Sequence, residues 1–153
     1  MLLGFVAAVL LVASSGAVFK PGEWYLRLAK PRWTPPGWLF GPAWAVLYIM
    51  IAVSGWMVWQ VAGFAGAAGA FAIYAVQLLL NASWSAVFFG LRRMDLAFAV
   101  LVALWLAIAA NAIAFAGFSQ EAALMLLPYL CWVTFAGALN LRVWQMNRGA
   151  AAA

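Results

Sequence analysis

The chain has 153 residues, of which 70% are apolar, 16% aromatic and only 7% charged, with a net charge of +5. Soluble domains contain about 45–50% apolar and about 25% charged residues, so the composition excludes an ordinary soluble globular protein. With no histidine, one cysteine (Cys131) and three scattered acidic residues, the chain also lacks the means for a histidine-ligated haem, a zinc or other metal site, a cysteine–histidine nucleophile, an internal disulfide or a paired-carboxylate acid and base.

The eleven charged residues leave four charge-free stretches: 1–19, 33–91, 96–120 and 122–141. A membrane-spanning helix needs roughly 20 mostly apolar residues, so the stretch 33–91 holds two spans and each of the others holds one. We therefore predict an all-α membrane protein, a bundle of five transmembrane helices forming a single domain over residues 1–148. In chain order the predicted spans are about 2–19, 42–61, 70–91, 96–115 and 122–143.

The connections between the spans differ in character. Residues 20–41 carry four basic residues and four prolines, and proline fixes φ and lacks a backbone donor, which predicts a stiff, irregular loop. The glycine-rich run 63–69 predicts a turn. The alanine-rich end, 149–153, is predicted to be a disordered tail.

With five spans, all eight Lys and Arg residues fall on one side of the membrane, together with the loop 20–41 and the C-terminus. Basic residues stay preferentially in the cytoplasm. We therefore predict a multi-pass protein of the bacterial cell membrane, with the loop 20–41 and the C-terminus cytoplasmic. The composition indicates no nucleic-acid partner.

The third span carries Gln77, Asn81 and Ser85 at intervals of four, with Trp84 beside them, so these residues share one face. Lipid offers amide groups no partner, which directs the face into the bundle. Two interpretations stay open: hydrogen bonds between packed helices, or a ligand pocket with polar anchors. A neighbouring stripe of small residues favours either packing within the monomer or a homodimer interface; it consists of Ala82, Ala86 and Gly90.

Spans two and five each combine large aromatic residues with small ones. Trp44 and Tyr48 share a face of the second span, and Trp132 and Ala136 share a face of the fifth. This is the composition of a cavity wall that holds a flat ligand, and equally that of ordinary packing. Trp132 lies too deep in its span to be explained as an interfacial tryptophan.

Three ordered motifs resemble a known family. Residues 30–38 (KPRWTPPGW) with 40–44 (FGPAW) and 47–48 (LY) resemble the first loop and second helix of the translocator protein family (TspO/MBR), whose bacterial members are called tryptophan-rich sensory proteins. Residues 77–90 (QLLLNASWSAVFFG) and 128–140 (PYLCWVTFAGALN) resemble its third and fifth helices. The match extends over about residues 18–147.

The resemblance implies a five-helix bundle, commonly dimeric, that binds porphyrins such as protoporphyrin IX and, in animal members, cholesterol and benzodiazepine-site drugs. By motif position, Trp44, Asn81, Trp84 and Trp132 would line the pocket, with Tyr48, Gln77 and Ala136 nearby and Lys30 as a partner for a porphyrin propionate. Leu141-Arg142 stands where animal members have tyrosines, and Leu96 replaces a tryptophan of the drug site. These departures leave sterol binding open and give no ground for assuming tight binding of the drugs.

Three functions remain open. The first is a porphyrin-binding sensor or regulator that requires no cofactor. The second is a light- and oxygen-dependent porphyrin-degrading enzyme, in which Trp44 and Trp132 would exchange electrons with the excited ring. The third is a transporter of porphyrin or sterol-like ligands, which the lack of charged residues in mid-membrane and of an inverted repeat disfavours.

Overall fold

A computed structural model describes residues 1–151, with side chains placed through Gly149. The described residues form helices and no strand, which confirms the all-α class. The elements are α1 (Leu2–Val18), α2 (Glu23–Arg27), α3 (Gly37–Gly66), α4 (Ala68–Ser85), a π-helical turn η1 (Ala86–Gly90), α5 (Met94–Ala116), α6 (Gln120–Met125) and α7 (Leu127–Ala151).

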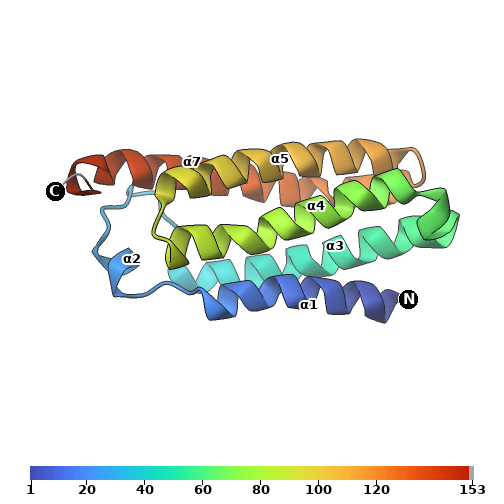
Figure 1. Cartoon of the computed structure of the whole chain (residues 1–153), viewed down its shortest axis with the longest axis horizontal. Coiled ribbons are helices and arrows are strands. Elements are labelled where there is room, and N and C mark those ends of the chain that lie inside the picture. The colour runs from blue at the N-terminus through green and yellow to red at the C-terminus, as the bar shows by residue number, and fades with distance from the viewer. Residues whose placement is uncertain (152–153) are drawn as a thin grey trace.

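The long helices lie side by side as an elongated bundle (Figure 1). Four segments are long and apolar enough to cross a membrane, namely α3, α4 with η1, α5, and α6 with α7. The apolar α1 has 17 residues, about 26 Å of helix, and packs against α3 and α4. Within the described part of the chain, these segments are the five helices of a membrane bundle.

The helices approach closely where α3 crosses α1 and α4. A Cβ added at Gly55 would lie 2.9 Å from the rings of both Phe5 and Tyr74. These two rings stand edge to face with their centroids 6.0 Å apart. Because real Cβ contacts are not that short, only glycine allows the three helices to approach this closely.

Several helix boundaries differ from the predicted ones because of proline and glycine. The second span begins at Gly37, directly after Pro36, and continues through Pro42, the predicted start. The chain turns at Gly63, whose φ of 64° is one that favours glycine. The fifth span is broken between α6 and α7 at Leu126, because Pro128 cannot donate to the carbonyl of Leu124.

The ends of two predicted segments also need correction. The loop predicted over 20–41 ends at Pro36 and contains the short helix α2. The predicted disordered tail begins as helix, since α7 continues through Ala151, while residues 152–153 lie outside the described part of the chain.

The two ends of the bundle differ in charge. The loop after α1, the connection from α4 to α5 and the last turns of α7 lie at one end, and the N-terminus lies at the other (Figure 1). All eight Lys and Arg residues belong to these segments at the first end, which we call the basic end. Two of its arginines form exposed ion pairs, Arg27 with Glu23 and Arg93 with Asp95, each at 2.7 Å.

Candidate functional site

The bundle contains a cavity of about 560 Å³ that extends inward from the basic end, within the size range of small-molecule sites. Its walls come from α1, the loop 19–36, α3, α4 with η1, α5 and α7. The loop forms the wall of the cavity at this end with Pro21, Tyr25 and Lys30. Most of the lining is apolar or aromatic, with a few polar groups among it.

Seven of the eight ligand-binding residues named from the sequence line this cavity: Trp44, Tyr48, Asn81, Trp84, Trp132, Ala136 and Lys30. The eighth, Gln77, is fully buried and does not reach the cavity surface. The lining also includes residues that the sequence did not single out as site residues, among them Tyr25, Phe40, Phe88, Phe89 and Asn140.

Aromatic rings from α3 and α7 form a continuous wall. The rings of Trp44 and Tyr48 stack with centroids 5.4 Å apart, and Trp44 meets Trp132 nearly perpendicularly at 6.4 Å. Phe40 lies edge to face on Trp132 at 5.8 Å. The indole Nε1 of Trp132 is buried and has no hydrogen-bond partner within the described protein. The wall thus offers flat apolar faces and indole groups able to donate hydrogen bonds.

Four polar side chains form one hydrogen-bonded chain that begins at the cavity with Tyr48 and Asn81 and continues into the protein interior. The Tyr48 hydroxyl donates to Asn81 Oδ1 at 3.2 Å, and Asn81 Nδ2 donates to the Tyr129 hydroxyl at 2.6 Å. Tyr129, which is completely buried, donates in turn to Gln77 Oε1 at 2.9 Å. Gln77 therefore supports the network through Tyr129 without lining the cavity itself. Tyr129, on which the chain depends, lies within the PYL motif of α7 but was not selected from the sequence.

A second polar link fixes the opposite side of the cavity. Trp84 Nε1 donates to Asn140 Oδ1 at 3.1 Å, and Asn140 Nδ2 donates to the carbonyl of Met94 at 2.9 Å. These two bonds connect α4, α7 and the start of α5. Because unpaired amides are costly away from water, they fix the orientation of the Trp84 indole.

The π-helical turn η1 brings two consecutive aromatic residues to the cavity. In this turn Leu91 N donates to the carbonyl of Ala86, five residues earlier, at 2.9 Å. Phe88 and Phe89 both line the cavity, with centroids 4.9 Å apart. A π-turn inserts an extra residue into a helix and is often found at functional sites. Hydropathy patterns carry no signal for it.

Lys30 is positioned by the loop that carries it. Its Nζ donates to the carbonyls of Tyr25 at 2.6 Å and Leu28 at 3.2 Å, and lies 4.4 Å from the centroid of the Tyr25 ring. The neighbouring Ala29 exchanges two backbone hydrogen bonds with the Asn147 side chain of α7, at 3.0 and 2.9 Å. An ammonium has three donors, so one is left for a ligand. Desolvation lowers the pKa of Lys30.

The cavity offers binding groups rather than an acid and base pair. In the lining that the structure describes, Lys30 is the sole Lys or Arg, and there is no carboxylate. Glu23 and Asp95 are held in the exposed ion pairs with Arg27 and Arg93. Among the described residues, no cluster of three His, Cys, Asp or Glu side chains resembles a metal site.

The small-residue stripe of the third span is partly used inside the monomer. Ala82 packs against the main hydrophobic core. A Cβ at Gly90 would lie 2.9 Å from the ring of Phe19, which follows α1. Ala86 is half-buried. The stripe therefore serves packing between α4, η1 and α1, and a dimer interface on it stays a prediction.

Comparison with known proteins agrees with the motifs. The family model described as "TspO/MBR family" matches residues 5–145. The chain is 42% identical to Protein CrtK of Rhodobacter capsulatus, over 95% of this chain and 91% of the relative. It is 41% identical to the tryptophan-rich sensory protein of Cereibacter sphaeroides (96% and 91% covered) and 39% identical to the translocator protein of Homo sapiens (96% and 90% covered). With its helices long and apolar enough to span a bilayer, the chain is an integral, multi-pass membrane protein that belongs to the TspO/MBR family.

Proposed function

We propose that this protein binds a porphyrin of the protoporphyrin type in the cavity at the basic end and acts as a membrane sensor or regulator. The observation that carries the proposal is the cavity of about 560 Å³ whose aromatic wall includes Trp44 and Trp132. Aromatic faces suit a flat macrocycle, which gains from offset and edge-to-face contacts with them. Membership of the family supports a sensor or translocator role in the membrane.

The remaining groups of the cavity suit the polar parts of such a ring. Trp132 lines the cavity, and its buried Nε1 has no hydrogen-bond partner within the described protein, so it is available as a donor to a ligand that packs against the indole. Lys30 lies in the loop with one free donor, where a propionate would otherwise be left unpaired at a low-dielectric entrance. With no histidine in the chain, the usual proximal haem ligand is missing, which favours a ring without iron.

An absorbance titration in the dark tests the proposal directly. Protoporphyrin IX added to the purified protein in detergent is expected to shift its absorption bands in a saturable manner and to quench tryptophan fluorescence. Spectra identical to those of the porphyrin in empty micelles, with unchanged tryptophan fluorescence, would contradict porphyrin binding.

Lys30→Met should weaken protoporphyrin IX binding at least about tenfold, because a charge-assisted hydrogen bond to a propionate is worth about 1.5–3 kcal/mol. Deprotonation removes the positive charge of this bond and also one of the three donors, two of which already bind the carbonyls of Tyr25 and Leu28. Since desolvation lowers the pKa of Lys30, the affinity of the native protein should fall as the pH rises through that lowered value. Titrations across alkaline pH should show this fall for the native protein and not for Lys30→Met. A porphyrin diester, which has no free propionate, serves as the control ligand.

The contact between Trp44 and Trp132 favours a second candidate function, porphyrin degradation driven by light and oxygen. With centroids 6.4 Å apart on the cavity wall, either indole would touch a bound ring and could exchange an electron with its excited state. The double variant Trp44→Phe and Trp132→Phe keeps aromatic faces but removes the oxidisable indoles. It should lower the rate of illuminated, aerobic porphyrin loss at saturating protein at least about tenfold. An unchanged rate would leave the protein as a binder.

The orientation and assembly belong to the same proposal. The basic end, with the loop 19–36 and the C-terminal part of α7, faces the cytoplasm according to the preference of basic residues for that side. Porphyrin would then enter from the cytoplasmic side.

A homodimer through the exposed side of α4 near Ala86 remains compatible with the packing of Ala82 and Gly90 inside the monomer.

A further inference from the structure

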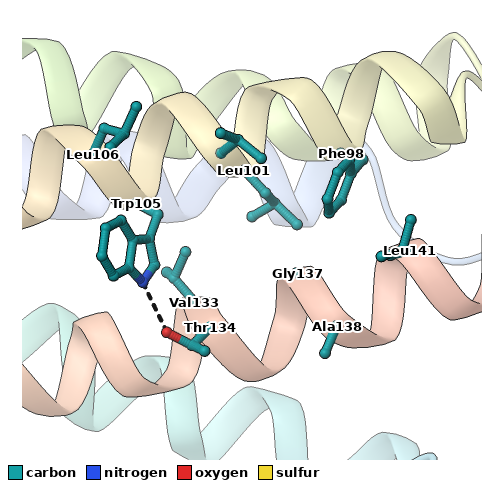
Figure 2. A pocket seen from close by; sticks show the side chains of 10 residues that line it. Phe98, Leu101, Trp105, Leu106, Val133, Thr134, Gly137, Ala138 and Leu141 are labelled. Carbon is teal, nitrogen blue, oxygen red and sulfur yellow. Dashed lines mark hydrogen bonds between the residues drawn. The ribbon is translucent and has the colours of Figure 1, made fainter.

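A second hollow, of about 330 Å³, lies between α5 and α7 and shares only Leu101 with the lining of the porphyrin cavity. It extends from Phe98 and Leu141 to Trp105 and Thr134 (Figure 2), and we call it the α5–α7 groove. Its one polar pair is internally satisfied, since Trp105 Nε1 donates to Thr134 Oγ1, and Thr134 Oγ1 donates to the carbonyl of Leu130, each at 2.8 Å. The groove therefore presents an apolar surface.

The length of the groove along the helix axis is close to the hydrocarbon thickness of one membrane leaflet. On α5 its lining extends from Phe98 to Leu106, about 12 Å along the helix axis. It begins one turn after α5 starts at Met94, at the basic end, and finishes near the middle of that helix. One leaflet contributes about 15 Å of hydrocarbon. The groove thus follows the path of an acyl chain whose headgroup lies at the basic end.

The groove is open because α7 carries small residues there. Gly137 and Ala138 line it, and a Cβ added at Gly137 would meet no atom within 4 Å. An apolar surface without neighbouring atoms lacks dispersion contacts. An apolar group from the hydrocarbon region of the membrane would restore these contacts by filling the groove.

Arginines lie where a headgroup would be. Arg142 follows Leu141 and is exposed, with a 3.4 Å contact to Gln145. The ring of Phe98 lies 6.5 Å from that of Trp144, and the Arg148 guanidinium lies 4.8 Å from the Trp144 centroid. Guanidinium groups pair with phosphate bidentately, and tryptophan is favoured at the membrane interface.

We propose that the α5–α7 groove binds an acyl chain of an anionic phospholipid, whose phosphate pairs with Arg142 and Arg148. The charge at the end of the groove matches such a headgroup. A second copy of this chain matches the groove less well. A helix with its side chains is about 10 Å wide, which is wider than an acyl chain. A two-fold interface through the groove would also bring Arg142 close to Arg142 of the second copy, and the two positive charges would repel each other.

Native mass spectrometry of the full chain released from detergent tests this inference, using phosphatidylglycerol and phosphatidylcholine with identical acyl chains. The native protein should retain more phosphatidylglycerol. Arg142→Gln should lower its retention roughly fivefold, the effect of about 1 kcal/mol per interfacial basic residue. The retention of phosphatidylcholine should fall less, because its choline cation already neutralises the phosphate. Arg27→Gln removes the same charge from α2, outside the groove, and should change neither lipid.

A second pair of variants tests the groove itself. Gly137→Leu should lower the retention of both lipids several-fold by filling open space, whereas Gly137→Ala should have little effect. Equal retention of the two lipids by the native protein, or retention unaffected by Gly137→Leu, would overturn the proposal. A Gly137→Leu variant with altered oligomeric mass and unaltered lipid retention would assign the groove to a protein partner and would equally overturn it.

Discussion

Tyr129→Phe is expected to lower the free energy of unfolding of the detergent-solubilised protein by about 2 kcal/mol. The Tyr129 hydroxyl accepts from Asn81 Nδ2 and donates to Gln77 Oε1, at 2.6 and 2.9 Å, in a site with no exposed surface. Its removal leaves a buried donor and a buried acceptor unpaired, and each unsatisfied group costs about 1–3 kcal/mol. The net cost is smaller than the sum of these two penalties, because polar groups also find hydrogen-bond partners in the unfolded, membrane-embedded state.

Tyr74→Phe provides the matched control for this prediction. The Tyr74 hydroxyl is also buried and donates to the carbonyl of Ile51 at 2.9 Å, but that carbonyl also accepts from Ser54 Oγ at 2.8 Å. Removing this hydroxyl therefore leaves no group without a partner, and the loss of stability should be smaller. Thermal unfolding of both variants, followed by circular dichroism in the same detergent, measures the difference. A Tyr129→Phe variant as stable as Tyr74→Phe would show that the network contributes little.

The spans could be predicted because a bilayer imposes a simple rule on composition. Only apolar segments of helix length without charges can cross it, and the eleven charges mark their limits. The exact ends could not be predicted from hydropathy, which does not register how a helix starts or breaks. Pro36 starts α3 before Pro42, and Pro128 divides the fifth span into α6 and α7.

The sequence identified some of the cavity residues and missed others. Trp44, Asn81 and Trp132 were recognisable because helical spacing and family motifs place them on inward faces. Tyr129 was missed because its role depends on the partner that it meets across the bundle, more than 40 positions away in the chain. Phe89 was missed because an α-helix turns it about 100° from Phe88, away from the face that helical spacing selects; in the structure both rings belong to η1 and line the cavity.

Ala136→Phe is expected to weaken protoporphyrin IX binding at least about tenfold while leaving the bundle folded. Ala136 lines the cavity one turn after Trp132, so a phenyl ring there projects into the space that the macrocycle would fill. Overpacking typically costs about 1–3 kcal/mol, and about 1.4 kcal/mol corresponds to a tenfold loss of affinity. In the empty protein the added ring enters open cavity, so its unfolding temperature should change little.

Ala138→Phe places the same ring on the other side of the same helix and separates the two effects. Ala138 is exposed and lines the α5–α7 groove instead of the cavity. Porphyrin affinity, measured by tryptophan quenching in the dark, should therefore remain native in Ala138→Phe and fall in Ala136→Phe. Native affinity in both variants would mean that the porphyrin binds elsewhere on the bundle. An equal loss in both would point to a general disturbance of α7, because Ala136 faces the cavity and Ala138 faces the groove on that helix.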